Sequence, residues 1–276
     1  MPTVLRPLSL GELLDRTFFL YRKHFMLFVG IVALPHLAFL ALQLGGVVMR
    51  DPVSLRGVVA TAGWTLLTML IYVLALAAST SATVVAVSDV HLDKSTSVSA
   101  AYNAIKSRIP HLLLIMVGVW IGVMLGFVLI IIPGIILALM WSLTIPVAVI
   151  EKKGLREATA RSSALTKGNR GRIFVVYFLF TVLMYIVTLL WEGPLLMVVG
   201  LRAQAGNPAQ MMSSFQVVAA IGSFITQSLV GPLLTIALSL IYYDERVRKE
   251  AFDLEVMMKS LEGATNSGAA AAVTGS

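Results

Sequence analysis

The chain contains no cysteine among its 276 residues, and only 13% of its residues are charged. The absence of cysteine excludes a disulfide framework, a thiolate nucleophile and a cysteine-based metal site. Known catalytic sequences are missing too, since there is no P-loop, no HExxH, no GxSxG and no carboxylate pair in a plausible soluble pocket. The sequence therefore predicts a protein that is not an enzyme and that holds no cofactor.

Apolar residues are abundant instead: they make up 58% of the chain, and its mean hydropathy is +0.90. Both values lie far above those of soluble domains. A bilayer core about 30 Å thick requires roughly 20 apolar residues per helix. Six segments meet this requirement, at 25–48, 58–88, 111–132, 133–150, 173–200 and 215–243. Their runs are continuous and do not alternate with period two, which excludes a β-barrel. The prediction is an all-α, polytopic membrane protein with six transmembrane helices.

The boundaries of this membrane domain are set by composition. No small-residue cleavage pattern follows the charged residues of 1–24, so the first span is expected to be retained. The chain is expected to turn at Pro133-Gly134, and the short fourth span is expected to be tilted or partly interfacial. The sixth is expected to continue as a helix to about Leu261. A single membrane domain thus covers 1–262, and the Ala, Gly, Ser and Thr of 263–276 predict a disordered tail.

Basic residues predict the orientation of the spans. If the N-terminus lies in the cytoplasm, 18 of the 21 Lys and Arg residues fall in cytoplasmic segments. Only Arg50, Arg56 and Arg202 remain outside. Because cytoplasmic loops are enriched in Lys and Arg, the bias predicts that both termini are cytoplasmic. The expected location is the bacterial inner membrane.

Short amphipathic segments precede three of the spans. The first begins with Ser9 and Glu12, which fit a capping box, and the others lie at 97–105 and 154–166. Each is expected to lie on the membrane surface before the chain enters the bilayer. The pattern suggests three repeats of a surface helix and a membrane hairpin, with boundaries near 9–90, 95–150 and 154–243.

The loop after the fourth span is strongly basic. It carries seven such residues: Lys152, Lys153, Arg156, Arg161, Lys167, Arg170 and Arg172. Basic residues near an anionic leaflet attract its headgroups, so these side chains are candidates for binding anionic lipid. A role in fixing the topology alone would explain them equally well. Nucleic acid is not an expected partner, because no recognisable binding module accompanies the charges.

Three spans carry polar residues at helical spacing. In spans two, five and six these stripes predict a polar cavity or headgroup groove whose candidate residues are Thr68, Tyr72, Thr188, Glu192 and Gln227. Packing is the simpler explanation, since small hydroxyl residues allow helices to approach and bond to their own carbonyls. Glu192 near the outer end of its span fits an interfacial carboxylate. His36 has no partner at metal-ligand spacing, which favours a packing role.

Five motifs together resemble a known family. They are SLGELLDRTF at 9–18, IPGI at 132–135, WSLTIPV at 141–147, ARS at 160–162 and YYDERVRKE at 242–250. In this order they are similar to the bacterial family of glycerophosphoryl diester phosphodiesterase membrane domains, over most of 5–260. In that family the membrane domain is sometimes fused to a soluble phosphodiesterase barrel, which supplies the catalysis. Only a short tail follows Leu261 here, so the resemblance implies fold and location rather than activity.

Two functions remain open from the sequence. The first is a non-catalytic inner-membrane protein that binds or organises anionic lipid, or that binds a membrane or cytoplasmic protein partner. The alternative is a transporter or channel for a small amphiphilic solute, because transporters often combine repeats with interrupted helices. An intramembrane hydrolase is less favoured, since no nucleophile has an evident base.

Overall fold

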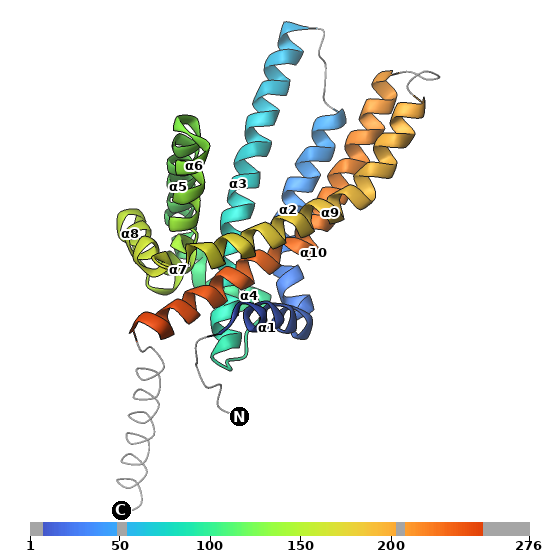
Figure 1. Cartoon of the computed structure of the whole chain (residues 1–276). Coiled ribbons are helices and arrows are strands. Elements are labelled where there is room, and N and C mark those ends of the chain that lie inside the picture. Colours follow the sequence, from blue (N-terminus) through green and yellow to red (C-terminus); the bar gives the residue numbers. More distant parts are fainter. Residues whose placement is uncertain (1–7, 49–53, 203–207, 251–276) are drawn as a thin grey trace, which may run out of the picture.

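The computed structural model describes residues 8–48, 54–202 and 208–250, and across these ranges it contains helices and no strand (Figure 1). The short elements are α1 (Leu10–Lys23), α4 (Val98–Ile105), the 3-10 helix η1 (Lys106–Arg108), α6 (Ile131–Met140), α7 (Thr144–Ile150) and α8 (Leu155–Thr166). The long ones are α2 (Phe25–Val48), α3 (Leu55–His91), α5 (Ile109–Leu129), α9 (Arg170–Arg202) and α10 (Pro208–Glu250). The predicted all-α architecture is confirmed.

Six segments are long and apolar enough to cross a bilayer, which confirms the predicted number of spans. Helices α2, α3, α9 and α10 rise side by side, and the α5–α6 hairpin stands on the other side of α3 (Figure 1). Helices α1, α4 and α8 gather near one end of this bundle, which we call the base. The end of α2, the start of α3, the end of α9 and the start of α10 lie at the opposite end.

The fourth span differs from its prediction in two ways. The chain turns at Ile130 and not at Pro133-Gly134. Pro133 lies in the first turn of α6, where proline costs no helical hydrogen bond. The span is also two helices, since residues 141–143 form a turn between α6 and α7. With 10 residues, α6 is about 15 Å long, only half of a bilayer core.

Helix α8 hydrogen-bonds the backbone groups that this interruption leaves free. Ser162 Oγ donates to Met140 O at 2.7 Å and accepts from Leu143 N at 3.1 Å. The Trp141 ring packs on α5 so closely that a Cβ at Gly122 would lie 2.3 Å from it. Irregular backbone is tolerated at membrane depth only where it is buried in protein or lines a cavity. Here the irregular backbone at 141–143 packs against α8 at Ser162 and against α5 at Gly122, which satisfies this requirement.

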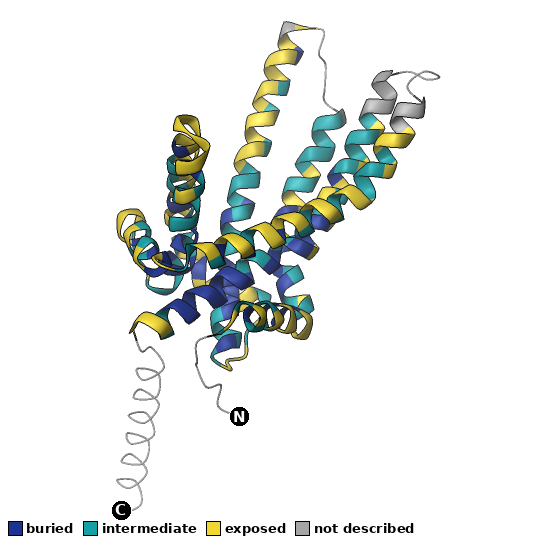
Figure 2. Cartoon of the chain, in the orientation of Figure 1, coloured by how far each residue is buried: buried dark blue, intermediate teal, exposed yellow. Residues whose placement is uncertain are grey.

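The buried core is concentrated towards the base, and the opposite ends of the helices are largely exposed along their apolar faces (Figure 2). Tyr242, Phe28 and Leu13 are almost completely buried in this core. Leu66, Val128 and Leu190 are each at least 68% exposed towards the opposite end. Exposed apolar surface of this kind is what a helix presents to lipid.

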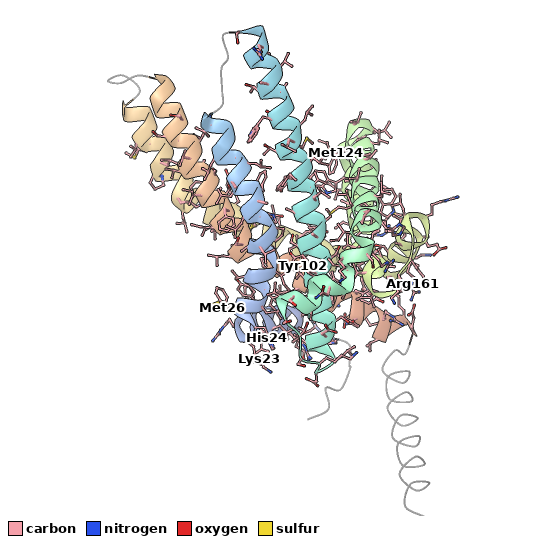
Figure 3. All side chains as sticks on the ribbon, turned by 180° about the vertical axis from the view of Figure 1, so that it is seen from behind. Lys23, His24, Met26, Tyr102, Met124 and Arg161 are labelled. Atoms are coloured by element: carbon pink, nitrogen blue, oxygen red, sulfur yellow. The ribbon has the colours of Figure 1, made fainter. Side chains whose placement is uncertain are left out.

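A tyrosine from a short helix compensates for a proline within a span. Pro35 lacks an N–H, so the carbonyl of Ile31, four residues earlier, loses its helical partner. Tyr102 of α4 donates its hydroxyl to that carbonyl at 2.5 Å (Figure 3). Such replacement partners are what allow proline within a membrane helix.

Two predictions about organisation remain predictions. Helices form near all three expected surface segments, and the capping box of α1 is present, with Ser9 N donating to Glu12 Oε2 at 2.8 Å. A short helix followed by two spans occurs three times in order, but this order alone demonstrates neither a position on the membrane surface nor an internal repeat. The expected helix continues at least to Glu250, while its end near Leu261 and the tail at 263–276 lie outside the described residues.

Candidate functional site

An inner cavity of about 570 Å³ lies between α3, α5, α9, α10 and the interruption of the fourth span. Trp141, Ser142 and Pro146 line it from the interruption itself. Met124 lines it from α5 (Figure 3), and Tyr177 from α9. Most of the lining is apolar, so the cavity can accommodate a hydrocarbon chain.

A few polar groups in this lining have no partner. The Gln227 amide and the Thr181 hydroxyl make no hydrogen bond within the described ranges. Other hydroxyls of the stripes are satisfied by their own helices, as in Thr83, which donates to Ser79 O at 2.8 Å. An amide without a partner at membrane depth is unfavourable. Gln227 is therefore available to a polar group of a ligand.

A second, outer cavity of about 730 Å³ lies farther from the base, between α2, α3, α9 and α10. Its lining is more polar and includes Gln43, Thr61 and Glu192. It also contains the aromatic side chains of Phe39, Trp64 and Tyr72.

The structure separates the five residues that the sequence grouped into one polar cavity. Thr68, Tyr72 and Glu192 line the outer cavity, and Gln227 lines the inner one. Thr188 is half-buried and lines neither. Thr68 also donates to its own helix, at 2.8 Å from Trp64 O, as the packing explanation expects.

His36 packs beside the outer cavity. It is 2% exposed, its Nδ1 lies 2.8 Å from Val32 O, and its ring is perpendicular to that of Tyr72. Within the described ranges, no group of three His, Asp or Glu side chains could hold a metal ion.

Three of the seven candidate headgroup residues instead form ion pairs within the protein. Lys153 Nζ lies 2.8 Å from Glu151, and Arg161 Nε lies 3.2 Å from the same carboxylate. Arg161 also pairs with Glu250 of α10 (Figure 3). Arg172 pairs with Asp244, whose side chain is fully buried. The ion pairs of Arg161 and Arg172 thus hold α8 and α9 against α10.

The end of α10 supplies the acidic side of this arrangement. Asp244 also binds Arg248 at 3.0 Å, and its Oδ1 accepts from Leu8 N at 2.6 Å. Glu245 is fully buried and accepts from Asn169 Nδ2 at 2.8 Å. We call the set of Glu151, Arg161, Arg172, Asp244, Glu245, Arg248, Lys249 and Glu250 the basal ion-pair network.

Glu151 is held ionised by this network. Burial alone would raise its pKa, but hydrogen bonds from Lys153 and Arg161, the nearby Arg161 charge and a hydrogen bond from Tyr242 lower the pKa below its ordinary value. Tyr242 donates to Glu151 at 3.0 Å. The carboxylate therefore links α7, α8 and α10 while it remains charged.

The other four candidate headgroup residues make no ion pair with any described residue: Lys152, Arg156, Lys167 and Arg170. Lys152, Arg156 and Lys167 are exposed, and Arg170 is half-buried. The basic segment thus contains a paired set that supports the fold and an exposed set that is free to meet a ligand.

Sequence reasoning missed the roles of Ser162, Trp141 and the acidic residues of α10. A signal for the acids was present, since Asp244 and Glu245 directly follow an apolar span and the basic segment requires counter-charges. Nothing in the sequence indicated that Ser162, on a different helix, would hydrogen-bond the interruption at 141–143. No local pattern marked the inner cavity either.

Comparison with known proteins identifies the family. No curated protein and no solved structure matches the chain at a significant level. A family model described as the membrane domain of glycerophosphoryl diester phosphodiesterase matches residues 106–262. This match covers more than half of the chain, including the interrupted fourth span, the basic segment and the helices α9 and α10, which line both cavities. The chain is a multi-pass membrane protein that belongs to the glycerophosphoryl diester phosphodiesterase membrane-domain family.

Proposed function

We propose that this chain is a non-catalytic membrane protein that binds lipid, with a hydrocarbon chain of the lipid in the inner cavity. The observation that carries the proposal is the position of this cavity at the interruption of the fourth span. Interrupted helices line the binding sites of many membrane proteins, and irregular backbone at membrane depth is tolerated where it lines a cavity.

The composition of the lining favours an amphiphile over a polar solute. Trp120, Met124 and Tyr177 offer apolar and polarisable surface, while Gln227 and Thr181 offer hydrogen bonds. An acyl chain with an ester or hydroxyl group would satisfy both kinds of surface.

The exposed basic set is the proposed contact for anionic headgroups. Lys152, Arg156 and Lys167 are free of ion pairs with described residues, and each such charge attracts an anionic leaflet by about 1 kcal/mol. If the protein lies in a bacterial inner membrane with its base and both termini on the cytoplasmic side, these side chains would face anionic lipid. The 18 basic residues of the predicted cytoplasmic segments support that orientation.

Filling the inner cavity tests the proposal. Gly231 lines this cavity, and a Cβ there would approach only the flexible Gln227 side chain, at 3.4 Å. Gly231→Leu should therefore fold and occupy the space of the ligand. The matched control is Gly63→Leu, because a Cβ at Gly63 would meet nothing within 4 Å outside its own helix backbone, and Gly63 lines neither cavity.

Native mass spectrometry of the purified proteins would count the lipids that remain bound. The wild type and Gly63→Leu should each retain one lipid that Gly231→Leu has lost. Equal retention by all three proteins would refute lipid binding in the inner cavity.

Neutralising the exposed basic set tests the headgroup contact separately. The triple change Lys152→Gln, Arg156→Gln and Lys167→Gln should lower the preference for phosphatidylglycerol over phosphatidylcholine. Equal removal of charge from exposed residues on other elements provides the control: Arg22→Gln, Lys94→Gln and Lys106→Gln. If both triple variants lose the same preference, the attraction is general and the assignment to 152–167 is wrong.

Transport of an amphiphile is the second candidate, favoured by two cavities that follow one another along α3 and α10. Because the chain has no cysteine, single cysteines can report access to water. A transporter should expose Gln227→Cys to an impermeant thiol reagent, and Thr188→Cys provides a comparison outside both cavities. An unreactive cysteine at 227 would exclude an aqueous route through the inner cavity.

A protein partner is the remaining possibility for the exposed basic set. An acidic partner would compete with anionic lipid for Lys152, Arg156 and Lys167. Retention of a co-purified protein by the wild type, and its loss from the triple variant, would favour that role.

A further inference from the structure

The outer cavity is a site separate from the inner one. Thr226 lies on α10 between Ser223, which lines the outer cavity, and Gln227, which lines the inner cavity. Trp191 Nε1 donates to Thr226 Oγ1 at 3.0 Å and so ties α9 to α10 at this level. A ligand of the outer cavity would therefore be recognised by its own set of side chains.

The charge of this lining has one sign. Glu192 is half-buried and makes no hydrogen bond or ion pair within the described ranges. No Lys, Arg or His lines the outer cavity among the residues that the structure describes. An ionised side chain in a membrane span is costly without a counter-charge. The lining therefore complements a cation.

The shape of the cation follows from the aromatic side chains. The Phe39 and Tyr72 rings lie with their centroids 4.9 Å apart. Trp64 is held in place by a hydrogen bond from its Nε1 to Leu42 O at 2.9 Å. Aromatic faces attract ammonium groups, above all quaternary ammonium, which is weakly hydrated, and tryptophan is the most effective ring. A small metal ion would instead require several oxygen ligands.

We propose that the outer cavity binds an amphiphile whose polar end carries a quaternary ammonium group. Glu192 supplies the counter-charge, and the aromatic side chains of Phe39, Trp64 and Tyr72 surround the ammonium. The hydrocarbon part passes between the helices towards the surrounding lipid. A zwitterionic lipid headgroup and a free cationic amphiphile share this chemistry.

The test uses the full chain in dodecyl maltoside, with dodecyltrimethylammonium as the probe and native mass spectrometry to count bound probe. The wild type should hold one probe molecule in a saturable manner. Glu192→Gln keeps the size of the side chain and removes its charge, so it should bind the probe about tenfold more weakly. Glu157→Gln, at an exposed carboxylate of α8, should bind like the wild type.

Phe39→Leu provides a second variant that keeps the charge and removes an aromatic face, and it should also weaken binding. Gly231→Leu, which fills only the inner cavity, should leave binding of the probe unchanged. The test therefore distinguishes a failure of the proposal for the inner cavity from a failure of the proposal for the outer cavity. Dodecylphosphocholine then distinguishes the two sources: a lipid headgroup site binds it as well as the cationic probe. No saturable binding, or equal binding by the wild type, Glu192→Gln and Phe39→Leu, would overturn the proposal.

Discussion

Removing the charge of Asp244 should destabilise the protein more than any equivalent change at an exposed acid. Its side chain is fully buried and pairs with Arg172, which is 14% exposed, and with Arg248, which is 34% exposed. Asp244→Asn keeps an oxygen that can still accept from Leu8 N, but it leaves both guanidinium groups without their counter-charge.

The magnitude follows from the exposure of the two arginines. Loss of one partner from a buried pair costs about 3–5 kcal/mol. Arg248 is exposed enough to turn towards water, so its share is small. Arg172 is not, and a loss of about 3 kcal/mol is expected, near the lower end of the range. For a chain of this size, that loss corresponds to a fall in Tm of about 6–12 °C.

The assay is thermal unfolding of detergent-solubilised protein followed by intrinsic tryptophan fluorescence. Asp15→Asn is the matched control, since Asp15 is exposed on α1 and should change stability by less than about 0.5 kcal/mol. In a double-mutant cycle with Arg172→Gln, the combined loss should be smaller than the sum of the single losses. Equal Tm values for Asp244→Asn and Asp15→Asn, or strictly additive losses, would refute the role given to the basal ion-pair network.

Two further predictions concern the fourth span and acid stability. Ser162→Ala should cost about 1–3 kcal/mol, because Leu143 N loses its partner and Met140 O keeps only the Thr166 hydroxyl at 3.4 Å. Ser163→Ala, which removes only a bond to its own helix, should cost far less in the same thermal assay. Glu151 has a pKa lowered below its ordinary value in the folded protein, so its contribution is present above the unfolded pKa and is lost as pH falls through the folded pKa. Glu151→Gln should therefore be less stable than the wild type at pH 7 and lose less stability between pH 5 and pH 3; parallel curves of Tm against pH for the two proteins would contradict this.

Composition and local pattern determined the architecture. Six apolar runs predicted six spans, because the thickness of the bilayer sets a length that can be counted along the chain. The capping box at Ser9 was also predictable, since it depends on groups only three residues apart. The polar stripes of α3 were visible at helical spacing, and several of their hydroxyls do bond to their own helix.

The tertiary structure decided which of those residues act together. Seven basic residues in one segment looked equivalent in the sequence, but Asp244 and Glu250 of α10, together with Glu151 directly before the segment, select which of them are paired. The five candidates for one polar cavity were likewise divided between two cavities, with Thr188 in neither. Hydropathy measures the free energy of transferring a segment into lipid. It does not indicate which other segments that segment packs against. The interruption at 141–143, closed by a serine about 20 residues later in the chain, and the cavity beside it are properties of helix packing, which only the folded chain decides.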